Sequence, residues 1–222
     1  FAREKNHPPS LAMAYALVPI TYHLLREPES VLRVGGEIFS LSQQFDVPLW
    51  HHLGSIICAS ASGEIEKLGQ LIEASESSGQ NFFGSFYTML LAHLIGKTRS
   101  VEEGLDALDR AQAKMEKSDE RIIEPEIHRM RGELLVKKSG GGRSDSGDTT
   151  VEECFRHSLD IAENMGARTL ALRTATSLAR LMRDQNRKTE ARSLVETAYA
   201  RMTEGFDTRD LIDARDLIGE LS

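Results

Sequence analysis

Apolar residues recur along the chain at the spacing of one face of an α-helix. Between positions 31 and 45, Val31, Val34, Ile38 and Leu41 stand three or four residues apart, which places them on one side of a helix. At four places a small residue is followed, two and three positions later, by two large apolar residues. These small residues are Gly54, Ala92, Gly132 and Ala179.

The four small residues lie at intervals of 38, 40 and 47 residues, with no strand pattern between them. A period near 40 without strands is typical of stacked helical hairpins. Because two helix axes approach closely only where a side chain is small, we expect each small residue to face the returning helix of its own hairpin. The pattern therefore predicts an all-α fold, a right-handed α-α superhelix of about five helical hairpins.

Turn residues divide this pattern into segments. We predict one solenoid domain over 1–222, with hairpins at about 10–45, 48–77, 82–117, 124–165 and 167–203 and a C-terminal capping helix at 208–221. Within two of the hairpins we expect turns at 60–63 and 96–99. The glycine- and serine-rich segment 139–148 is predicted to be a flexible insertion between the helices of the fourth hairpin, which lengthens the last interval.

One copy carries a fuller motif, Trp50-x-x-Leu53-Gly54-x-x-Ile57. This motif resembles the tetratricopeptide-repeat (TPR) signature, although the other copies have Thr88, His128 and Ala175 in place of the tryptophan. The resemblance implies a divergent TPR-like solenoid. Such a solenoid usually displays a surface for a partner and carries no reaction centre.

A second resemblance covers nearly the whole chain. It rests on EIHRMRGELL at 126–135, ALR at 171–173, SLARL at 177–181, and TEGFDT at 203–208 followed by Asp210 and Leu211. Together these are similar to the C-terminal repeat region of large bacterial regulators, in which a class III adenylate/guanylate cyclase domain or a DNA-binding domain precedes a predicted ATPase domain. The resemblance implies that the chain is the sensing or docking fragment of a signalling protein and is not itself an enzyme.

Composition agrees with a soluble cytoplasmic protein. The net charge of −7 and the pI of about 5.6 argue against a general nucleic-acid or anionic-membrane surface. The longest apolar stretch, 11–20, contains Pro19 and is shorter than the roughly 20 residues that span a bilayer. We expect Cys58 and Cys154 to be reduced packing residues.

Short motifs that suggest chemistry have no supporting context. Gly96-Lys97-Thr98 resembles the end of a phosphate-binding loop, but Leu91 occupies the position where that loop needs its first glycine. His51 and His52 are adjacent, so on a helix they point about 100° apart and do not chelate one metal. We therefore predict no catalytic residue, no cofactor and no metal site.

The inner surface of the predicted solenoid is the best candidate for a binding site. In a TPR stack the first helix of each hairpin lines the concave groove, and its exposed positions are set by distance from the small residue. These positions hold His51, Ser55, Met89, His93, Lys97, Arg129, Glu133, Lys137, Thr176, Arg180 and Arg183. The set becomes basic toward the C-terminus, so we expect a groove that binds an acidic peptide or a carboxylate tail, on a protein segment or another domain of the parent chain.

Two alternatives remain open at this point. The eleven positions are equally compatible with an ordinary solvated helix face. The chain is also compatible with a small-molecule sensor that binds an inducer, for which the aromatic cluster of Phe82, Phe83, Phe86 and Tyr87 would supply the platform.

Overall fold

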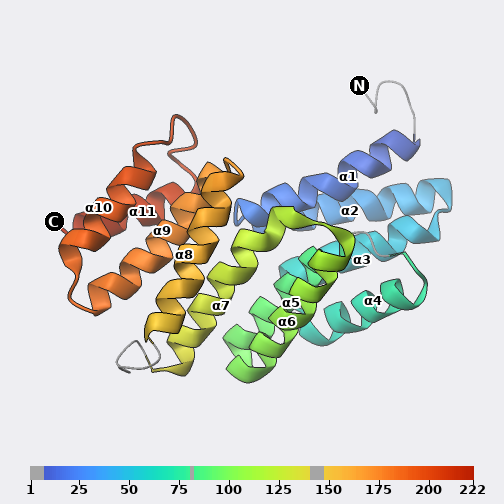
Figure 1. The fold of residues 1–222 in the computed structure, drawn as a ribbon. Helices are drawn as coiled ribbons and strands as arrows, with labels where there is room; N and C mark the ends of the chain where they lie inside the picture. Colours follow the sequence, from blue (N-terminus) through green and yellow to red (C-terminus); the bar gives the residue numbers. More distant parts are fainter. Residues whose placement is uncertain (1–7, 81–82, 141–147) are drawn as a thin grey trace. The chain divides into compact units, whose positions relative to one another are not determined.

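The computed structural model describes residues 8–80, 83–140 and 148–222, and within these ranges the chain contains helices and no strands (Figure 1). This confirms the prediction of an all-α fold. The helices are α1 (Pro8–Leu24), α2 (Pro28–Phe45), α3 (Pro48–Ser62), α4 (Ile65–Ser77), α5 (Gly84–Thr98), α6 (Val101–Ser118), a short 3-10 helix η1 (Arg121–Ile123), α7 (Glu124–Lys138), α8 (Asp148–Asn164), α9 (Arg168–Asp184), α10 (Lys188–Tyr199) and α11 (Arg209–Glu220). Consecutive helices pack against one another from α1 to α4 and from α6 to α11.

The chain divides into two compact units, Phe1–Leu91 (unit 1) and Ala92–Ser222 (unit 2). Unit 1 contains α1 to α4 and the first half of α5, whereas unit 2 contains the second half of α5 and the helices from α6 onward. One continuous solenoid over 1–222 stays a prediction. The central part of the insertion predicted at 139–148 lies outside the described residues.

Prolines and a serine determine where several helices begin. Pro28, Pro48 and Pro125 occupy the first or second position of α2, α3 and α7, where a missing N–H costs no helical hydrogen bond. Ser100 precedes α6, and its Oγ accepts a hydrogen bond from the Glu103 amide at 3.2 Å. By contrast, Pro19 lies inside α1, and the helix continues through it.

Two of the predicted turns are wrong. Helix α3 continues through the first three residues of the predicted turn at 60–63 and ends at Gly63, which adopts the left-handed conformation with φ of 72°. Helix α5 likewise continues to Thr98, so only Arg99 of the predicted turn at 96–99 remains outside it. The Nζ of Lys137 donates hydrogen bonds to the Gly96 and Lys97 carbonyls, both at 2.9 Å, and so satisfies acceptors in the last turn of α5.

Small residues permit close helix contacts, but not always with the expected partner. A Cβ added to Gly132 of α7 would lie 2.7 Å from the Phe155 ring of α8, within the same hairpin as predicted. A Cβ on Gly54, however, would lie 3.3 Å from the Gly35 carbonyl oxygen of α2, so Gly54 faces the preceding hairpin and the predicted contact with α4 is wrong. Between α5 and α6 a close approach occurs at Gly96, one turn after Ala92, because a Cβ added to Gly104 would lie 2.6 Å from the Gly96 Cα.

Helix α9 is the centre of unit 2, because it contacts α7, α8, α10 and α11. Every residue from Leu170 to Ala179 is buried, including the polar residues in that stretch. The surrounding core includes Phe155 of α8, Val195 of α10 and Leu211 of α11. A helix that is covered on several sides must pair its buried polar groups with neighbours, and α9 does so in the site described next.

Candidate functional site

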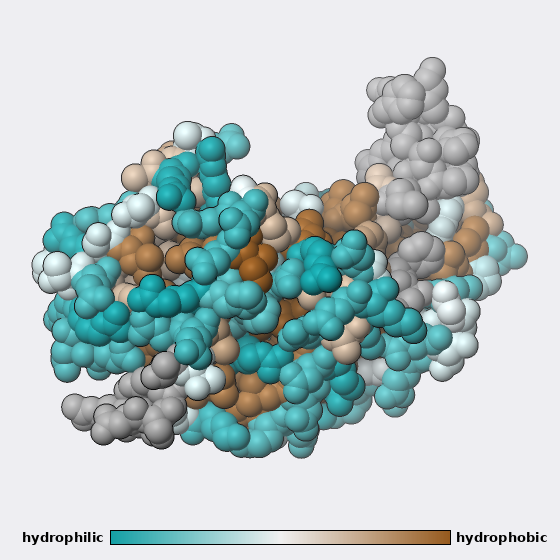
Figure 2. All heavy atoms as spheres, in the orientation of Figure 1, coloured by the Kyte–Doolittle hydropathy of each residue, from teal (hydrophilic) through white to brown (hydrophobic). Residues whose placement is uncertain are grey.

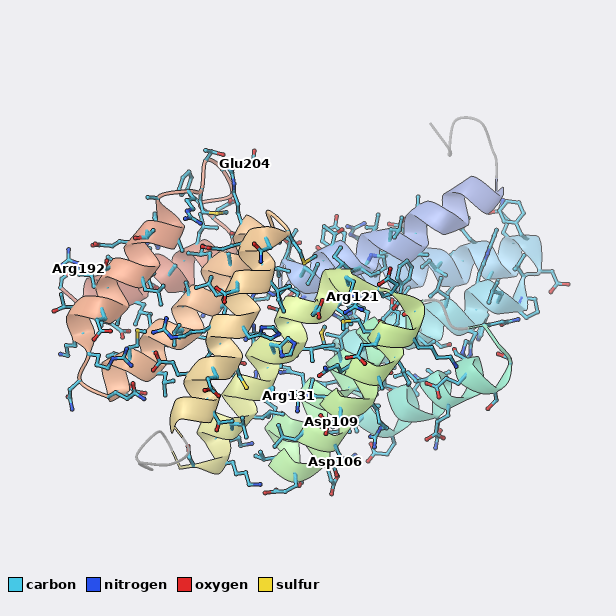
Figure 3. All side chains as sticks on the ribbon, in the orientation of Figure 1. Asp106, Asp109, Arg121, Arg131, Arg192 and Glu204 are labelled. Carbon is cyan, nitrogen blue, oxygen red and sulfur yellow. The ribbon has the colours of Figure 1, made fainter. Side chains whose placement is uncertain are left out.

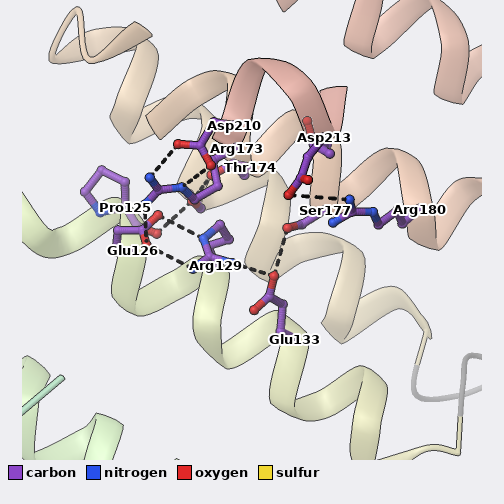
Figure 4. A network of polar contacts seen from close by, with 12 residues as sticks. Pro125, Glu126, Arg129, Glu133, Arg173, Thr174, Ser177, Arg180, Asp210 and Asp213 are labelled. Atoms are coloured by element: carbon purple, nitrogen blue, oxygen red, sulfur yellow. Dashed lines mark hydrogen bonds and ion pairs between the residues drawn. The ribbon is translucent and has the colours of Figure 1, made fainter. Parts of the chain in front are cut away.

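A chain of ion pairs, buried except at Glu133, connects three helices of unit 2 (Figure 4). From α7 it includes Glu126, Arg129 and Glu133, and it continues to Arg173 of α9 and Asp210 of α11. In order of contact the residues are Glu133, Arg129, Glu126, Arg173 and Asp210, so negative and positive charges alternate, and the formal charges sum to −1. We call these five residues the charge network.

Arg129 lies at the α7 end of the network between two carboxylates of its own helix. Its Nε and Nη2 donate to the two Glu126 oxygens, each at 2.9 Å, and its Nη1 contacts Glu133 at 2.5 Å. Ser177 of α9 donates to the same Glu133 oxygen at 3.0 Å. These contacts use the planar geometry of a guanidinium and tie α7 to α9.

Arg173 connects the two ends of the network. Its Nη1 donates to Glu126 at 3.1 Å, while its Nε and Nη2 contact the two Asp210 oxygens at 3.0 and 2.5 Å. The side chains of Glu126 and Asp210 are each only 3% exposed, and that of Arg173 is 9% exposed. A second polar contact lies beside it, where the Ser158 hydroxyl donates to the Pro125 carbonyl oxygen at 2.8 Å and lies 2.8 Å from the Thr174 hydroxyl.

The network keeps its groups charged. Burial alone would raise the pKa of Glu126, but the Arg129 and Arg173 guanidinium groups outweigh burial and hold this pKa at about 2. Burial opposes ionisation of Glu133 as well, yet Arg129 and the Ser177 hydroxyl lower its pKa. Both carboxylates are therefore ionised at neutral pH and hydrogen-bonded to fixed donors, an arrangement suited to holding helices together and unsuited to proton transfer.

His93 of α5 lies next to the network. Burial, the Arg129 charge and the Lys97 charge lower its pKa to about 4, whereas Glu133 and Glu126 act in the opposite direction. The imidazole is therefore neutral at physiological pH. His93 was one of the eleven predicted groove residues, and its place beside Glu133 and Arg129 brings three of those residues together.

Three of the eleven predicted groove residues are not exposed, which corrects the prediction for these positions. Met89 is 1% exposed, Thr176 is 3% exposed and Arg129 is 6% exposed. The Thr176 hydroxyl donates to the Leu172 carbonyl of its own helix, and Arg129 is enclosed in the charge network. None of the three side chains is available to line an open groove.

In unit 1 the structure describes two further predicted groove residues. His51 is exposed, and its ring packs edge-on against Phe39 of α2, with 4.9 Å between the ring centroids. The hydroxyl of the partly buried Ser55 donates to the His51 carbonyl at 3.0 Å, within α3.

The remaining cations of the predicted groove lie at the C-terminal ends of α5, α7 and α9 in unit 2. Lys97, Lys137 and Arg180 are exposed, and the side chain of Arg183 is 33% exposed. Arg183 pairs with Asp184 at 3.0 Å and with Glu220 at 2.6 Å, and Arg180 lies 4.0 Å from Asp213. The expectation of a basic groove is therefore corrected for both arginines, because nearby carboxylates balance their charges.

Sequence reasoning missed Glu126, Arg173 and Asp210 as members of a site. One signal was present, since Arg173 interrupts an otherwise apolar and small-residue run between Leu170 and Ala175. The two carboxylates that pair with Arg173, however, lie 37 and 47 residues away in sequence, and helical spacing carries no information over that distance.

No protein-family model matches the chain, and no curated protein is significantly similar to it in sequence. Among the described residues, no helix is both long enough and apolar enough to cross a membrane. Cys58 and Cys154 are free thiols, each partly buried.

Proposed function

We propose that the chain is a non-catalytic docking module of TPR-like hairpins, the regulatory region of a larger bacterial signalling protein that acts in the cytoplasm. Its partner would be a protein segment or another domain of the parent chain. The proposal is supported by the packing of consecutive helices from α1 to α4 and from α6 to α11, and by the small residues that bring α5 close to α6 and α7 close to α8. Stacked hairpins of this kind present side chains from successive helices on one continuous surface.

The observation that carries the proposal is a row of exposed side chains on unit 2. We call Lys97, Lys137, Arg180 and Arg183 the docking row. Lys137 is fixed to α5 through the Gly96 and Lys97 carbonyls, and α7 is fixed to α9 through the hydrogen bond between Glu133 and Ser177. The row therefore spans three helices whose mutual positions are set by polar contacts.

The charges around the docking row determine the kind of partner that fits. Asp184, Asp213 and Glu220 lie beside the two arginines. A partner with both acidic and basic side chains can exchange these pairs across the interface, whereas a uniformly acidic peptide would meet three carboxylates. On the face drawn in Figure 2, hydrophilic residues cover most of unit 2 and hydrophobic residues lie in smaller patches between them.

Site-specific photocrosslinking in cells tests this proposal. A photoreactive amino acid at position 97 should give one discrete crosslinked product, and Arg180→Glu combined with Arg183→Glu should abolish it. Arg192 is the matched control, because it lies on the outer side of α10 (Figure 3) and its side chain is 44% exposed and paired with Glu196. A product that survives the double charge reversal, or that is lost equally in Arg192→Glu, would contradict the proposed docking row.

A second candidate function, a small-molecule sensor, is favoured by one observation in unit 1. The Tyr87 hydroxyl is buried and has no hydrogen-bond partner among the described residues. The Phe86 ring packs edge-on against Tyr87, with 5.3 Å between the ring centroids, and the His23 ring packs edge-on against Phe86. Phe82 of the predicted aromatic cluster lies outside the described residues.

A thermal-shift screen against metabolites distinguishes this candidate from the docking module. A ligand present at 100 times its dissociation constant stabilises the folded chain by about 2.7 kcal/mol. A hit that acts through the Tyr87 hydroxyl should lose most of its effect in Tyr87→Phe. A hit with an unchanged shift in that variant would place the ligand elsewhere.

A further inference from the structure

A cleft of about 430 Å³ lies in unit 2, lined by residues where α8 ends, α9 begins and α10 ends. It is separate from the charge network and from the docking row. Its lining includes three alanines, namely Ala162, Ala171 and Ala198. Ala162 is fully buried and Ala171 is 7% exposed, so these side chains form a small apolar floor that leaves room above it.

Two arginines and one glutamate stand at the rim of this cleft. Arg201 pairs with Glu163 at 2.8 Å, and both side chains are about half exposed (54% and 44%). Within the described part of the chain, the Arg168 guanidinium donates one hydrogen bond, to the Arg201 carbonyl oxygen at the long distance of 3.4 Å. Among the described residues, no carboxylate forms an ion pair with Arg168, so the rim carries a formal charge of +1.

This arrangement matches one class of ligand. An arginine without an ionic partner binds a carboxylate through two parallel hydrogen bonds. A ligand with a single negative charge balances the rim, whereas a phosphate dianion would also face the Glu163 carboxylate. The floor offers methyl groups and no aromatic ring, which suits a short aliphatic chain and gives a nucleobase nothing to stack on.

We propose that this cleft binds a carboxylate group carried on a short aliphatic chain, with Arg168 as the principal contact. The carboxylate replaces the long contact between Arg168 and the Arg201 carbonyl, and the aliphatic chain lies over Ala171. Because the cleft begins at the first turn of α9, the helix dipole adds to the attraction for the anion. The inference goes beyond the proposed function, since the cleft binds this group whether or not the docking row engages a partner.

Two sources supply this chemistry, a free aliphatic acid and an acidic side chain of a peptide. Titration of the full 222-residue chain with butyrate, which carries one carboxylate, and separately with acetyl-Ala-Glu-Ala-amide distinguishes them. We expect saturable shifts of the Gly166 and Ala171 amide resonances in two-dimensional NMR spectra with at least one probe. A response to butyrate alone identifies the free acid as the ligand class, and a response to the peptide identifies the side chain.

Variants test the assignment of Arg168. Arg168→Gln should weaken binding about tenfold, because it removes a charge-assisted contact. Arg192→Gln makes the same change at an arginine on the outer side of α10 and should leave binding unchanged. Ala171→Leu should fill the cleft and abolish binding without altering its charge, with circular dichroism reporting whether this variant folds.

Three outcomes would overturn the proposal. The first is the lack of saturable shifts with both probes at concentrations up to about 10 mM. The second is equal binding by Arg168→Gln and the unmodified chain. The third is equal weakening by Arg168→Gln and Arg192→Gln, which would indicate attraction to charge in general. Each outcome is independent of the crosslinking result, so failure of the cleft and failure of the docking row are separable.

Discussion

Arg173 of α9 and Asp210 of α11 form a two-point contact in which Nε lies 3.0 Å and Nη2 lies 2.5 Å from the two carboxylate oxygens. Asp210 also belongs to the first turn of α11, where a negative charge is favourable to the helix dipole. The contact therefore attaches the last helix to the centre of unit 2. Burial of both partners makes this attachment sensitive to the loss of either one.

Removal of the Asp210 carboxylate should destabilise the protein strongly. In Asp210→Ala, Arg173 keeps Glu126 but loses its second carboxylate while remaining buried. We expect the free energy of unfolding to fall by about 3–5 kcal/mol, measured by urea denaturation with circular dichroism.

The control for this prediction lies one turn further along α11. Asp213 pairs with Arg209 and lies near Arg180, whose side chains are 60% and 45% exposed. Asp213→Ala should therefore cost about 1 kcal/mol or less. Equal losses in the two variants would show that burial of the Arg173 contact has no energetic consequence.

The contact between Gly132 and Phe155 predicts a cost for a single added methyl group. In Gly132→Ala the new Cβ would lie 2.7 Å from a ring that is itself only 1% exposed. We expect overpacking to lower the free energy of unfolding by about 1–3 kcal/mol. Thermal and urea denaturation both measure this loss.

Gly36 in α2 provides the matched comparison, because an added Cβ there meets nothing within 4 Å. Gly36→Ala should stabilise the protein by about 0.5–1 kcal/mol, since alanine loses less backbone entropy on entering a helix. Stabilisation by Gly132→Ala as well would mean that α7 and α8 are further apart than the structure places them.

The unpartnered Tyr87 hydroxyl predicts that its removal will stabilise the protein. Tyr87→Phe removes a buried donor that has no acceptor among the described residues, so it should raise the free energy of unfolding by about 1–3 kcal/mol. Tyr15→Phe is the matched control, because the Tyr15 hydroxyl donates to Glu37, and its loss should destabilise by about 1–3 kcal/mol. Destabilisation by Tyr87→Phe would instead reveal a bound acceptor at this hydroxyl.

Stability should fall as the pH decreases from about 6.5 to 4. Burial lowers the pKa of His23 to about 4, from an unfolded value of 6.5. In this window the unfolded chain binds a proton that the folded chain does not, so acid favours unfolding. Burial likewise lowers the pKa of His128, whose ring packs against His157, to about 4, which adds to the effect.

Urea midpoints at pH 7, 5.5 and 4.5 measure this dependence. Glu126, with its pKa of about 2, begins to lose its contribution only below an unfolded value of 4.5, so the histidines dominate the window. His23→Gln should reduce the loss between pH 7 and 4.5 by on the order of 2 kcal/mol. If the stability of His23→Gln depended on pH in the same way as that of the unmodified chain, His23 would not be a cause of the acid destabilisation.

Local structure was predictable because each helix carries its own signals. Apolar spacing indicated the helices, and Gly132 indicated the close contact between α7 and α8. The partner of Gly54 was not predictable, because a small residue shows that a neighbour is near but not which neighbour it is. The ion pair between Arg131 of α7 and Asp109 of α6, at 2.8 Å, was not predictable for the same reason, because a charged residue does not indicate which helix supplies its partner (Figure 3).

The prediction that all eleven groove residues are exposed failed for a related reason. The spacing rule assumes that the first helix of each hairpin has one open side, and α9 has neighbours on several sides. Thr176 is therefore covered by neighbouring helices. Arg129 is also shielded from solvent, because it pairs with Glu126, which in turn pairs with Arg173. The number of neighbours around a helix depends on the tertiary arrangement, which no local pattern in the sequence specifies.

The central position of Arg173 limits how this protein can be re-engineered. Repeat proteins are commonly shortened by excising a whole hairpin, since each repeat contacts only its neighbours. Excision of α9 and α10 would remove the cation between Glu126 and Asp210, so Glu126 would keep only Arg129 and the buried Asp210 would lose its contact with Arg173. The hairpins of unit 2 therefore cannot be removed independently of one another, and a truncated version would need a neutral replacement at Asp210.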